Sequence, residues 1–250
     1  MMKSIFATVL LAVALGADDA RADVYADALA SPTRLEADPA RDAGRKPDQV
    51  LAFFGIGPDM VVLDMFSGGG YYSEIMSKVV GKDGRVVAHS NIAYLQFVGD
   101  EFKARHADDR LPNVDVLMAE NNELALDANQ FDAITMVLSF HDTYWISPEE
   151  DWPEFDHPKL NAELFASLKP GGVLGVVDHY AATGSSSETG GAVHRIDPAI
   201  AIADFEAAGF VLEAKSDMLR NPDDDYSQGV FAAGIRGNTD RFILRFRKPE

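Results

Sequence analysis

The sequence predicts an α/β fold in which a doubly wound, mostly parallel sheet is covered by helices on both faces. Two observations carry this prediction. Short apolar segments alternate with helical segments along most of the chain, and the first apolar segment runs into three glycines, Gly68 to Gly70. Strands of parallel sheets are apolar because both of their faces are buried. The glycine run marks a strand-to-helix turn whose backbone can approach a ligand closely.

The first half of the chain supplies the first three predicted strands. Residues 26–45 are polar and rich in alanine, and two prolines divide them into short helical pieces. A proline at a helix start and a glycine after its end are the signals that bound the next helix. The expected elements are a helix from Pro47 that stops at Gly55, a strand at Val61 to Met65, a helix from Tyr72 to Val80, a strand at Val86 to Ala88, a helix from Ile92 to Arg105 and a strand at Val114 to Met118.

The second half continues the alternation and ends in two strands. The expected elements are a strand at Phe131 to Ser139, a helix from Lys159 to Leu168 that ends at a Pro-Gly-Gly turn, a strand at Val173 to Val177, a helix from Pro198 to Ala208, and strands at Phe210 to Ala214 and Arg241 to Arg247. The last two strands follow the last helix, so we expect a hairpin at the sheet edge. Residues 183–191 and the acidic run 223–225 read as a flexible loop and a solvated loop.

The N-terminus has the three-part pattern of a secretory signal peptide. Lys3 precedes an apolar run from Ile5 to Leu15, and a small-x-small cleavage site ends at Ala22. The run of about eleven residues is well short of the roughly 20 that a membrane-spanning helix needs, so no stable membrane anchor is expected. The sequence therefore predicts a signal peptide at residues 1–22 and export, to the periplasm, of the chain that follows.

Length and composition favour one domain after a short N-terminal arm. We expect the arm at residues 23–46 and the domain at residues 47–250, because no linker-like segment divides the remainder. The 250 residues include 40 acidic and 22 basic side chains, which gives a formal net charge of −18. Such a surface repels phosphate backbones and argues against a nucleic-acid partner. The absence of cysteine excludes disulfides and thiolate zinc sites.

Three strings carry a resemblance to a known family. They are VVLDMFSGGGYYSE at 61–74, FDAITMVLSFHD at 131–142 and LKPGGVLGVVDH at 168–179. In order and content they resemble the class I methyltransferases that use S-adenosylmethionine. The resemblance implies a Rossmann-like sheet of seven strands with an antiparallel last strand. The GGGYY turn and the string HRIDP at 194–198 are similar to an exported branch of predicted methyltransferases.

The resemblance also implies S-adenosylmethionine as the cofactor and a set of residues that bind it. Asp64 and the glycine turn match the family's acid-terminated strand and glycine-rich turn, although Phe66 replaces the first glycine. A position about 20 residues after the glycines commonly holds an acid that binds the ribose, and this chain offers His89 or Asn91 there. The cofactor-binding set implied is Asp64, Ser67, Gly68, Gly69, Gly70, His89 and Asn91, with Glu120 or Asn121 placed to meet the adenine.

Candidate catalytic residues follow the fourth and fifth predicted strands. Ligands of open α/β sheets sit beyond the carboxyl ends of the strands, where His141 and Asp142 follow one strand and Asp178 and His179 the other. Methyl transfer needs alignment of nucleophile and methyl group, helped by a base. We expect His141 or His179 to be that base, with Asp142 or Asp178 orienting it. Tyr144 and Trp145 would form an aromatic wall.

The same residues admit other interpretations. The aspartates could cap turns and the histidines could satisfy local hydrogen bonds. Two histidines and a carboxylate could also hold a divalent metal ion, although the expected site contains no metal ligand. His194 could close over the site, whereas Asp197 before Pro198 is more simply a helix cap.

Three functions follow from these interpretations. The first is an S-adenosylmethionine-dependent methyltransferase that acts on a small molecule or protein, with no oligomeric state predicted. The second is a catalytically inactive methyltransferase-like domain that binds a ligand or partner after export. The replacement of a glycine by Phe66 suggests this alternative. The third is a metal-assisted enzyme that uses His141, His179 and a nearby carboxylate.

Overall fold

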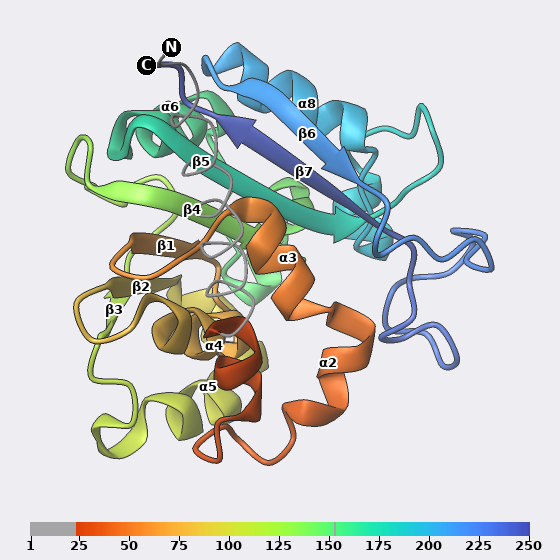
Figure 1. The fold of residues 1–250 in the computed structure, drawn as a ribbon. Helices are drawn as coiled ribbons and strands as arrows, with labels where there is room; N and C mark the ends of the chain where they lie inside the picture. Colours follow the sequence, from red (N-terminus) through yellow and green to blue (C-terminus); the bar gives the residue numbers. More distant parts are fainter. Residues whose placement is uncertain (1–23, 153) are drawn as a thin grey trace, which may run out of the picture.

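The computed structural model describes residues 24–152 and 154–250 and contains a single seven-stranded sheet (Figure 1). The predicted signal peptide, residues 1–22, lies outside the described residues. The strand order is β3-β2-β1-β4-β5-β7-β6, and only the two pairings of β7 are antiparallel among those described. The doubly wound, mostly parallel sheet with an antiparallel last strand is thus confirmed. The strands are β1 (Val61–Met65), β2 (Arg85–Ser90), β3 (Val114–Met118), β4 (Phe131–Val137), β5 (Leu168–His179), β6 (Val211–Ser216) and β7 (Arg241–Arg247).

Helices cover both faces of this sheet (Figure 1). Successive side chains of a strand point to opposite faces, so Val62 of β1 packs in one core and Leu63 in the other. The first core holds side chains of α3 and α4, and the second holds those of α6 and α8. The helices are α2 (Pro39–Arg45), α3 (Pro47–Phe54), α4 (Tyr71–Val80), α5 (Ile92–His106), α6 (His157–Ser167), α7 (Thr189–Val193) and α8 (Pro198–Ala207).

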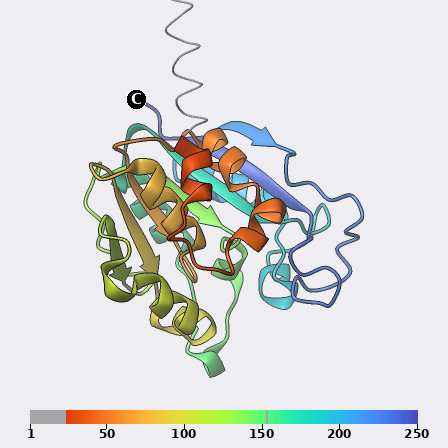
Figure 2. The same ribbon diagram turned by 60° about the horizontal axis from the view of Figure 1, so that its bottom comes forward.

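Residues 24–46 lie along the edge of the domain next to α4 (Figure 2). The hydroxyl of Tyr71, the first residue of α4, donates to Asp42 of α2 at 2.5 Å. Arg105 at the end of α5 forms a buried ion pair with Asp38. Arg241 of β7 donates to the carbonyl of Gly44 at 3.0 Å. These contacts tie the segment to three separate elements of the domain.

The last two strands pair antiparallel at the sheet edge, as predicted, and residues 217–240 connect β6 to β7. Two loop predictions need correction. The predicted Pro-Gly-Gly turn lies inside β5, which begins at Leu168. The register against β4 jumps between Phe131↔Leu168 and Ala133↔Val173, so the extra residues bulge out of the ladder. Part of the predicted loop 183–191 forms the start of α7.

The acidic run 223–225 is not wholly solvated. Asp224 is 5% exposed, and its carboxylate receives two hydrogen bonds of 2.9 Å from Arg195. A buried carboxylate is stable only with such partners. No helix of the described part of the chain is long and apolar enough to span a bilayer.

Candidate functional site

The glycine turn between β1 and α4 has the backbone of a ligand-binding loop. Phe66, Gly68 and Gly70 have φ values of 53°, 59° and 78°, in the left-handed region that favours glycine. The amide of Ser67 donates to the carbonyl of His89 at 2.9 Å, which fixes the turn against the end of β2. The positive φ at Phe66 gives a physical reason for the glycine that the resemblance places there.

Asp64 lies behind this turn rather than at its open side. One carboxylate oxygen accepts from Ser73 of α4 at 2.5 Å, and the other accepts from Thr135 of β4 at 3.0 Å. Burial raises the pKa of Asp64 to about 6, although both hydrogen bonds oppose that shift. Asp64 therefore joins α4 to β4, and a direct contact with the cofactor stays a prediction.

The residues predicted near the ribose and adenine lie together at the ends of β2 and β3. His89 is fully buried; its Nε2 donates to the carbonyl of Ala119 at 3.0 Å and its Nδ1 accepts from the amide of Phe66 at 3.4 Å. Burial lowers the pKa of His89 to about 4, which keeps the ring neutral. Asn91 caps α5 by accepting from Tyr94 N at 2.7 Å.

Asn121 differs from its neighbours because part of its amide is unpaired. Its Oδ1 accepts from Asn91 Nδ2 at 3.2 Å, whereas its own buried Nδ2 has no hydrogen-bond partner. An unpaired buried donor is costly and commonly marks a place that a ligand or water completes. Glu120, the other predicted adenine contact, is exposed.

Side chains of α5 cover the glycine turn. A Cβ placed on Gly69 would lie 2.3 Å from Glu101 Cδ, and one on Gly70 would lie 2.9 Å from Arg105 Cγ. Arg105 donates to the carbonyl of Gly69 at 2.9 Å and pairs with the buried Glu74. A ligand that approaches Gly69 must therefore displace the Glu101 side chain, which is 38% exposed and pairs with Arg41 at 2.6 Å and with Arg105 at 3.1 Å.

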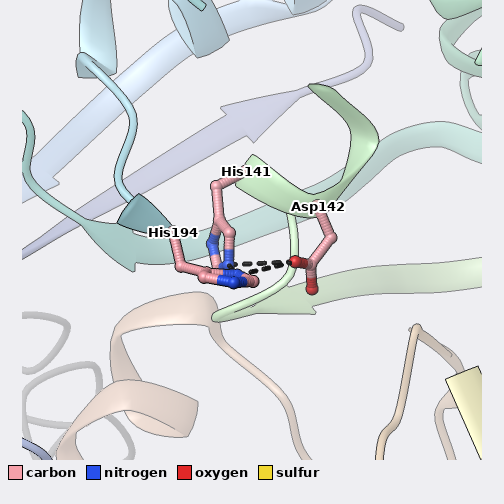
Figure 3. Close-up of side chains that lie close together, drawn as sticks. All are labelled: His141, Asp142 and His194. Atoms are coloured by element: carbon pink, nitrogen blue, oxygen red, sulfur yellow. Dashed lines mark hydrogen bonds and ion pairs between the residues drawn. The ribbon is translucent and has the colours of Figure 1, made fainter. Parts of the chain in front are cut away.

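The predicted catalytic residues His141 and Asp142 converge with His194, and all three side chains point toward one another (Figure 3). His141 Nε2 lies 3.1 Å from Asp142 Oδ1, and His194 Nδ1 lies 3.3 Å and 3.4 Å from those two atoms. Asp178 is outside this trio but holds it, since its Oδ1 is 2.7 Å from His141 Nδ1 and its Oδ2 accepts from the His141 amide at 2.8 Å. The ends of β4 and β5 are thereby joined.

The carboxylates set the protonation of the histidines. Burial alone lowers the pKa of His141, but Asp142 and Asp178 outweigh burial and raise that pKa to about 10. Burial likewise raises the pKa of Asp142, but the His141 charge outweighs burial and brings that pKa to about 2. The pair is an imidazolium and a carboxylate at neutral pH.

His179, the second predicted base, lies beside the trio but does not join it. Its Nδ1 is 2.6 Å from Thr239 Oγ1, and its ring centroid is 5.7 Å from that of His141. Burial, followed by the charge of His141, holds the pKa of His179 well below its usual range. This ring is neutral at pH 7.

The string HRIDP explains how His194 reaches the site. His194 ends α7 in a left-handed conformation with φ of 55°, and the fully buried Arg195 then pairs with Asp224. Ile196 N donates to the carbonyl of His179 at 3.0 Å, and Asp197 accepts from Ala199 N at 2.9 Å as the N-cap of α8. The helix-cap prediction for Asp197 is confirmed. His194 stands at the start of the HRIDP string, and that position was the sequence signal for its place in the site. The predicted catalytic set did not include it.

The predicted aromatic wall is only partly present. Trp145 lies near the trio, with its ring centroid 5.8 Å from that of His194. The Tyr144 ring instead stacks on His157 at 4.1 Å, and its hydroxyl donates to Asp204 of α8. Tyr94 of α5 was missed by the sequence analysis; burial, then Asp142, raises its pKa well above the usual range. Nothing in the sequence around Tyr94 indicated that its side chain lies near Asp142.

Comparisons with known proteins agree with this architecture. Residues 30–141, less than half of the chain, match the family model of protein-L-isoaspartate(D-aspartate) O-methyltransferase. A methyltransferase structure from Aquifex aeolicus, described as S-adenosylmethionine-dependent, is 24% identical, with a TM-score of 0.57 over 84% of this chain and 93% of that one. The chain has the fold of S-adenosylmethionine-dependent methyltransferases. No curated protein matches it significantly in sequence.

Two further structures with the methyltransferase fold show how wide its range is. A candidate sarcosine dimethylglycine methyltransferase of Galdieria sulphuraria is 16% identical, with a TM-score of 0.57 over 83% of this chain and 85% of that one. The 4+2 cyclase SpnF is 18% identical, with a TM-score of 0.53 over 83% and 82% of the two chains. One fold hosts different chemistries, so function must be argued from the site.

The residues of the site fit the cofactor that the family match and the fold support, S-adenosylmethionine. The turn before α4 holds Gly68 and Gly70 in left-handed conformations, and Asn121 has a free buried donor at the end of β3. Both features sit at the carboxyl edge of the sheet, where such folds bind their ligands. The fold by itself determines neither the reaction nor the acceptor.

Proposed function

We propose that this chain is an S-adenosylmethionine-dependent methyltransferase that methylates an oxygen or nitrogen of a small molecule or a protein. The observation that carries the proposal is the glycine turn, which is held in left-handed conformations at the carboxyl edge of the sheet. Ionised His141 and Asp142 lie beside it in the segment that follows the neighbouring strand β4. The family match over residues 30–141 includes the glycine turn and ends at His141.

The chain's own residues have distinct tasks in this proposal. The backbone of Ser67 to Gly70 holds the methionine part of the cofactor, and Asn121 Nδ2 donates toward the adenine. The bound cofactor supplies an electrophilic methyl group. Since a base must be neutral to accept a proton, His179 is the better of the two predicted bases, whereas His141 in the metal-free chain carries a proton between two carboxylates.

Charge restricts the acceptor. The net charge of −18 disfavours nucleic acid and other polyanions. A neutral or cationic small molecule, or a protein surface with exposed amines or hydroxyls, fits this field. We also propose export to the periplasm, and its only support is the signal-like sequence of residues 1–22. Methyl transfer there would require a source of cofactor outside the cytoplasm.

The second candidate is a ligand-binding domain without methyl transfer, and one observation favours it. The Phe66 ring replaces a family glycine and packs 5.0 Å from the His89 ring and 5.8 Å from the Phe155 ring, between the turn and the predicted ribose residues. A ring in that place reduces the space for a nucleoside. A domain that kept this fold but lost catalysis could accommodate the Phe66 ring at this position.

Calorimetric titration of the full chain with S-adenosylmethionine and S-adenosylhomocysteine tests the first candidate. We expect micromolar affinity, about 8 kcal/mol of binding free energy, and a weaker affinity in Asn121→Ala, which removes the unpaired donor. Absence of binding by protein with a cooperative thermal transition would reject the methyltransferase and favour the second candidate.

A further inference from the structure

Three side chains at the carboxyl edge present their ligand atoms to one point. Within the described part of the chain, His141, Asp142 and His194 form a group whose histidine nitrogens and carboxylate oxygen all lie within 4.8 Å of one another. They come from two segments, since His141 and Asp142 begin a 3-10 turn after β4 and His194 ends α7. We propose that they form a divalent transition-metal site with an open coordination position.

The spacing of the three ligand atoms matches a tetrahedral ion. With metal to ligand distances near 2.0–2.1 Å, two ligands of a tetrahedral ion lie about 3.3–3.4 Å apart. The observed separations are 3.1 Å, 3.3 Å and 3.4 Å around the triangle of His141 Nε2, Asp142 Oδ1 and His194 Nδ1. An ion that replaces the proton on His141 Nε2, which is released to solvent, can therefore occupy the apex above this triangle with only small movements of the three side chains.

The outer contacts of the trio are those of a metal-bound histidine. A ligating histidine almost always donates its other ring nitrogen to a carboxylate or carbonyl, which fixes the ring. His141 Nδ1 lies 2.7 Å from Asp178 Oδ1, so Nε2 is turned toward Asp142 and His194. Asp178 is fully buried and also accepts from the backbone amides of His141 and His179. The carboxylate that orients His141 is thus itself held in place.

The backbone around His194 is arranged to bring it to the trio. A Cβ on Gly190 of α7 would lie 2.5 Å from the carbonyl oxygen of His141, so only glycine lets α7 approach this closely. The Arg195 and Asp224 pair then anchors the next residue. The proximity of His194 Nδ1 to Asp142 is visible only in the tertiary structure, because the two residues are 52 positions apart in the sequence.

The site is accessible from one side. The side chains of His141 and Asp142 are 4% and 8% exposed, whereas that of His194 is 23% exposed. Two imidazoles and one carboxylate suit zinc, cobalt or iron(II) and leave a position for water or for an oxygen of a bound molecule. If the proposed methyl transfer is correct, this position fits an acceptor hydroxyl, whose acidity the cation would increase. The binding of metal itself does not depend on that function.

Metal binding is measured on the untagged full chain, stripped with chelator and titrated with Zn²⁺ and Co²⁺. We expect one equivalent of metal by elemental analysis and intense visible absorption of the Co²⁺ form, as a four- or five-coordinate site gives. Neither readout requires S-adenosylmethionine, so failure of the methyltransferase proposal would leave them unchanged. Substoichiometric metal in folded protein would overturn the proposal.

Variants locate the ion. His194→Gln removes the partly exposed ligand with little packing loss and should abolish the one-equivalent binding, and Asp178→Asn should weaken affinity about 10–100-fold through the His141 orientation. The control His106→Gln changes a half-buried histidine on α5, outside the trio, and should bind metal like the original chain. Equal binding by His194→Gln, with its fold verified by circular dichroism, would show that the metal lies elsewhere and overturn the assignment.

Discussion

His141 Nδ1 and Asp178 Oδ1 lie 2.7 Å apart, and this bond, together with the one from the His141 amide to Asp178 Oδ2, connects the segment after β4 to the end of β5. The carboxylate accepts, so the imidazole donates from Nδ1 and turns Nε2 toward Asp142 and His194. The orientation of the site thus depends on a residue that touches neither His194 nor, in the proposed function, the acceptor.

The charge on His141 predicts a pH dependence of stability. Its pKa rises from 6.5 to about 10 on folding, so the folded chain holds a proton that the unfolded chain releases above pH 6.5. The resulting stabilisation is complete below pH 6.5 and is lost as pH rises through 10. Denaturant unfolding of metal-free protein should show a loss on the order of a few kcal/mol over this window. His141→Gln should flatten that slope, whereas an equal slope in the variant would assign it to other groups.

The buried Arg195 and Asp224 pair predicts a large effect on both stability and the site. Arg195→Met leaves Asp224 buried without its partner and should cost about 3–5 kcal/mol of unfolding free energy. Lys82→Met, which breaks a well-exposed pair with Asp83, is the control and should change little. Urea titration checks both. A loss in Arg195→Met no larger than in the control would mean that the pair does not anchor the His194 segment.

Gly69 tests the ligand-binding role of the turn. Gly69→Val places carbon where the Glu101 side chain now lies, so Glu101 must leave its partly exposed ion pairs with Arg41 and Arg105. We expect a loss of about 1 kcal/mol or less in stability. The added side chain also blocks backbone approach, so affinity for S-adenosylhomocysteine should fall at least about tenfold. Gly99→Val on α5, where a Cβ meets no atom within 4 Å, is the matched control. Unaltered affinity in Gly69→Val would move the cofactor away from this turn.

Phe66 provides a matched pair of variants. Phe66→Ala and Phe66→Gly both empty the same ring position and should lose about 3–5 kcal/mol of stability. Because φ is 53° there, the glycine variant should be about 1 kcal/mol more stable than the alanine variant. If the ring also restricts the cofactor, both variants should bind S-adenosylhomocysteine more tightly in calorimetry. Equal stability of the two would show that the left-handed backbone carries no strain.

Most of the fold followed from local sequence. The apolar run before Gly68, and the Pro and Gly residues that bound α3 and α8, predicted the order and type of the elements, with ends displaced by a few residues. The exceptions depended on partners far along the chain. Gly171 and Gly172 read as a turn, but their pairing with Lys248 draws them into β5. Asp224 was predicted to be solvated, but Arg195 and the backbone amides of Tyr226 and Asp240 pair with its carboxylate and make its burial possible.

The candidate site divides in the same way. The sequence by itself determined that His141, Asp142, Asp178 and His179 gather at one edge of the sheet, because the carboxyl ends of parallel strands must meet there. Only the tertiary structure decided which histidine completes the trio, since the position of His194 depends on the approach of α7 to the turn after β4 and on the buried Arg195 pair. It also decided protonation: burial makes His179 neutral, while two adjacent carboxylates keep a proton on His141. Spacing along a chain carries no information on burial or on neighbouring charge, and those two quantities set the chemistry of this site.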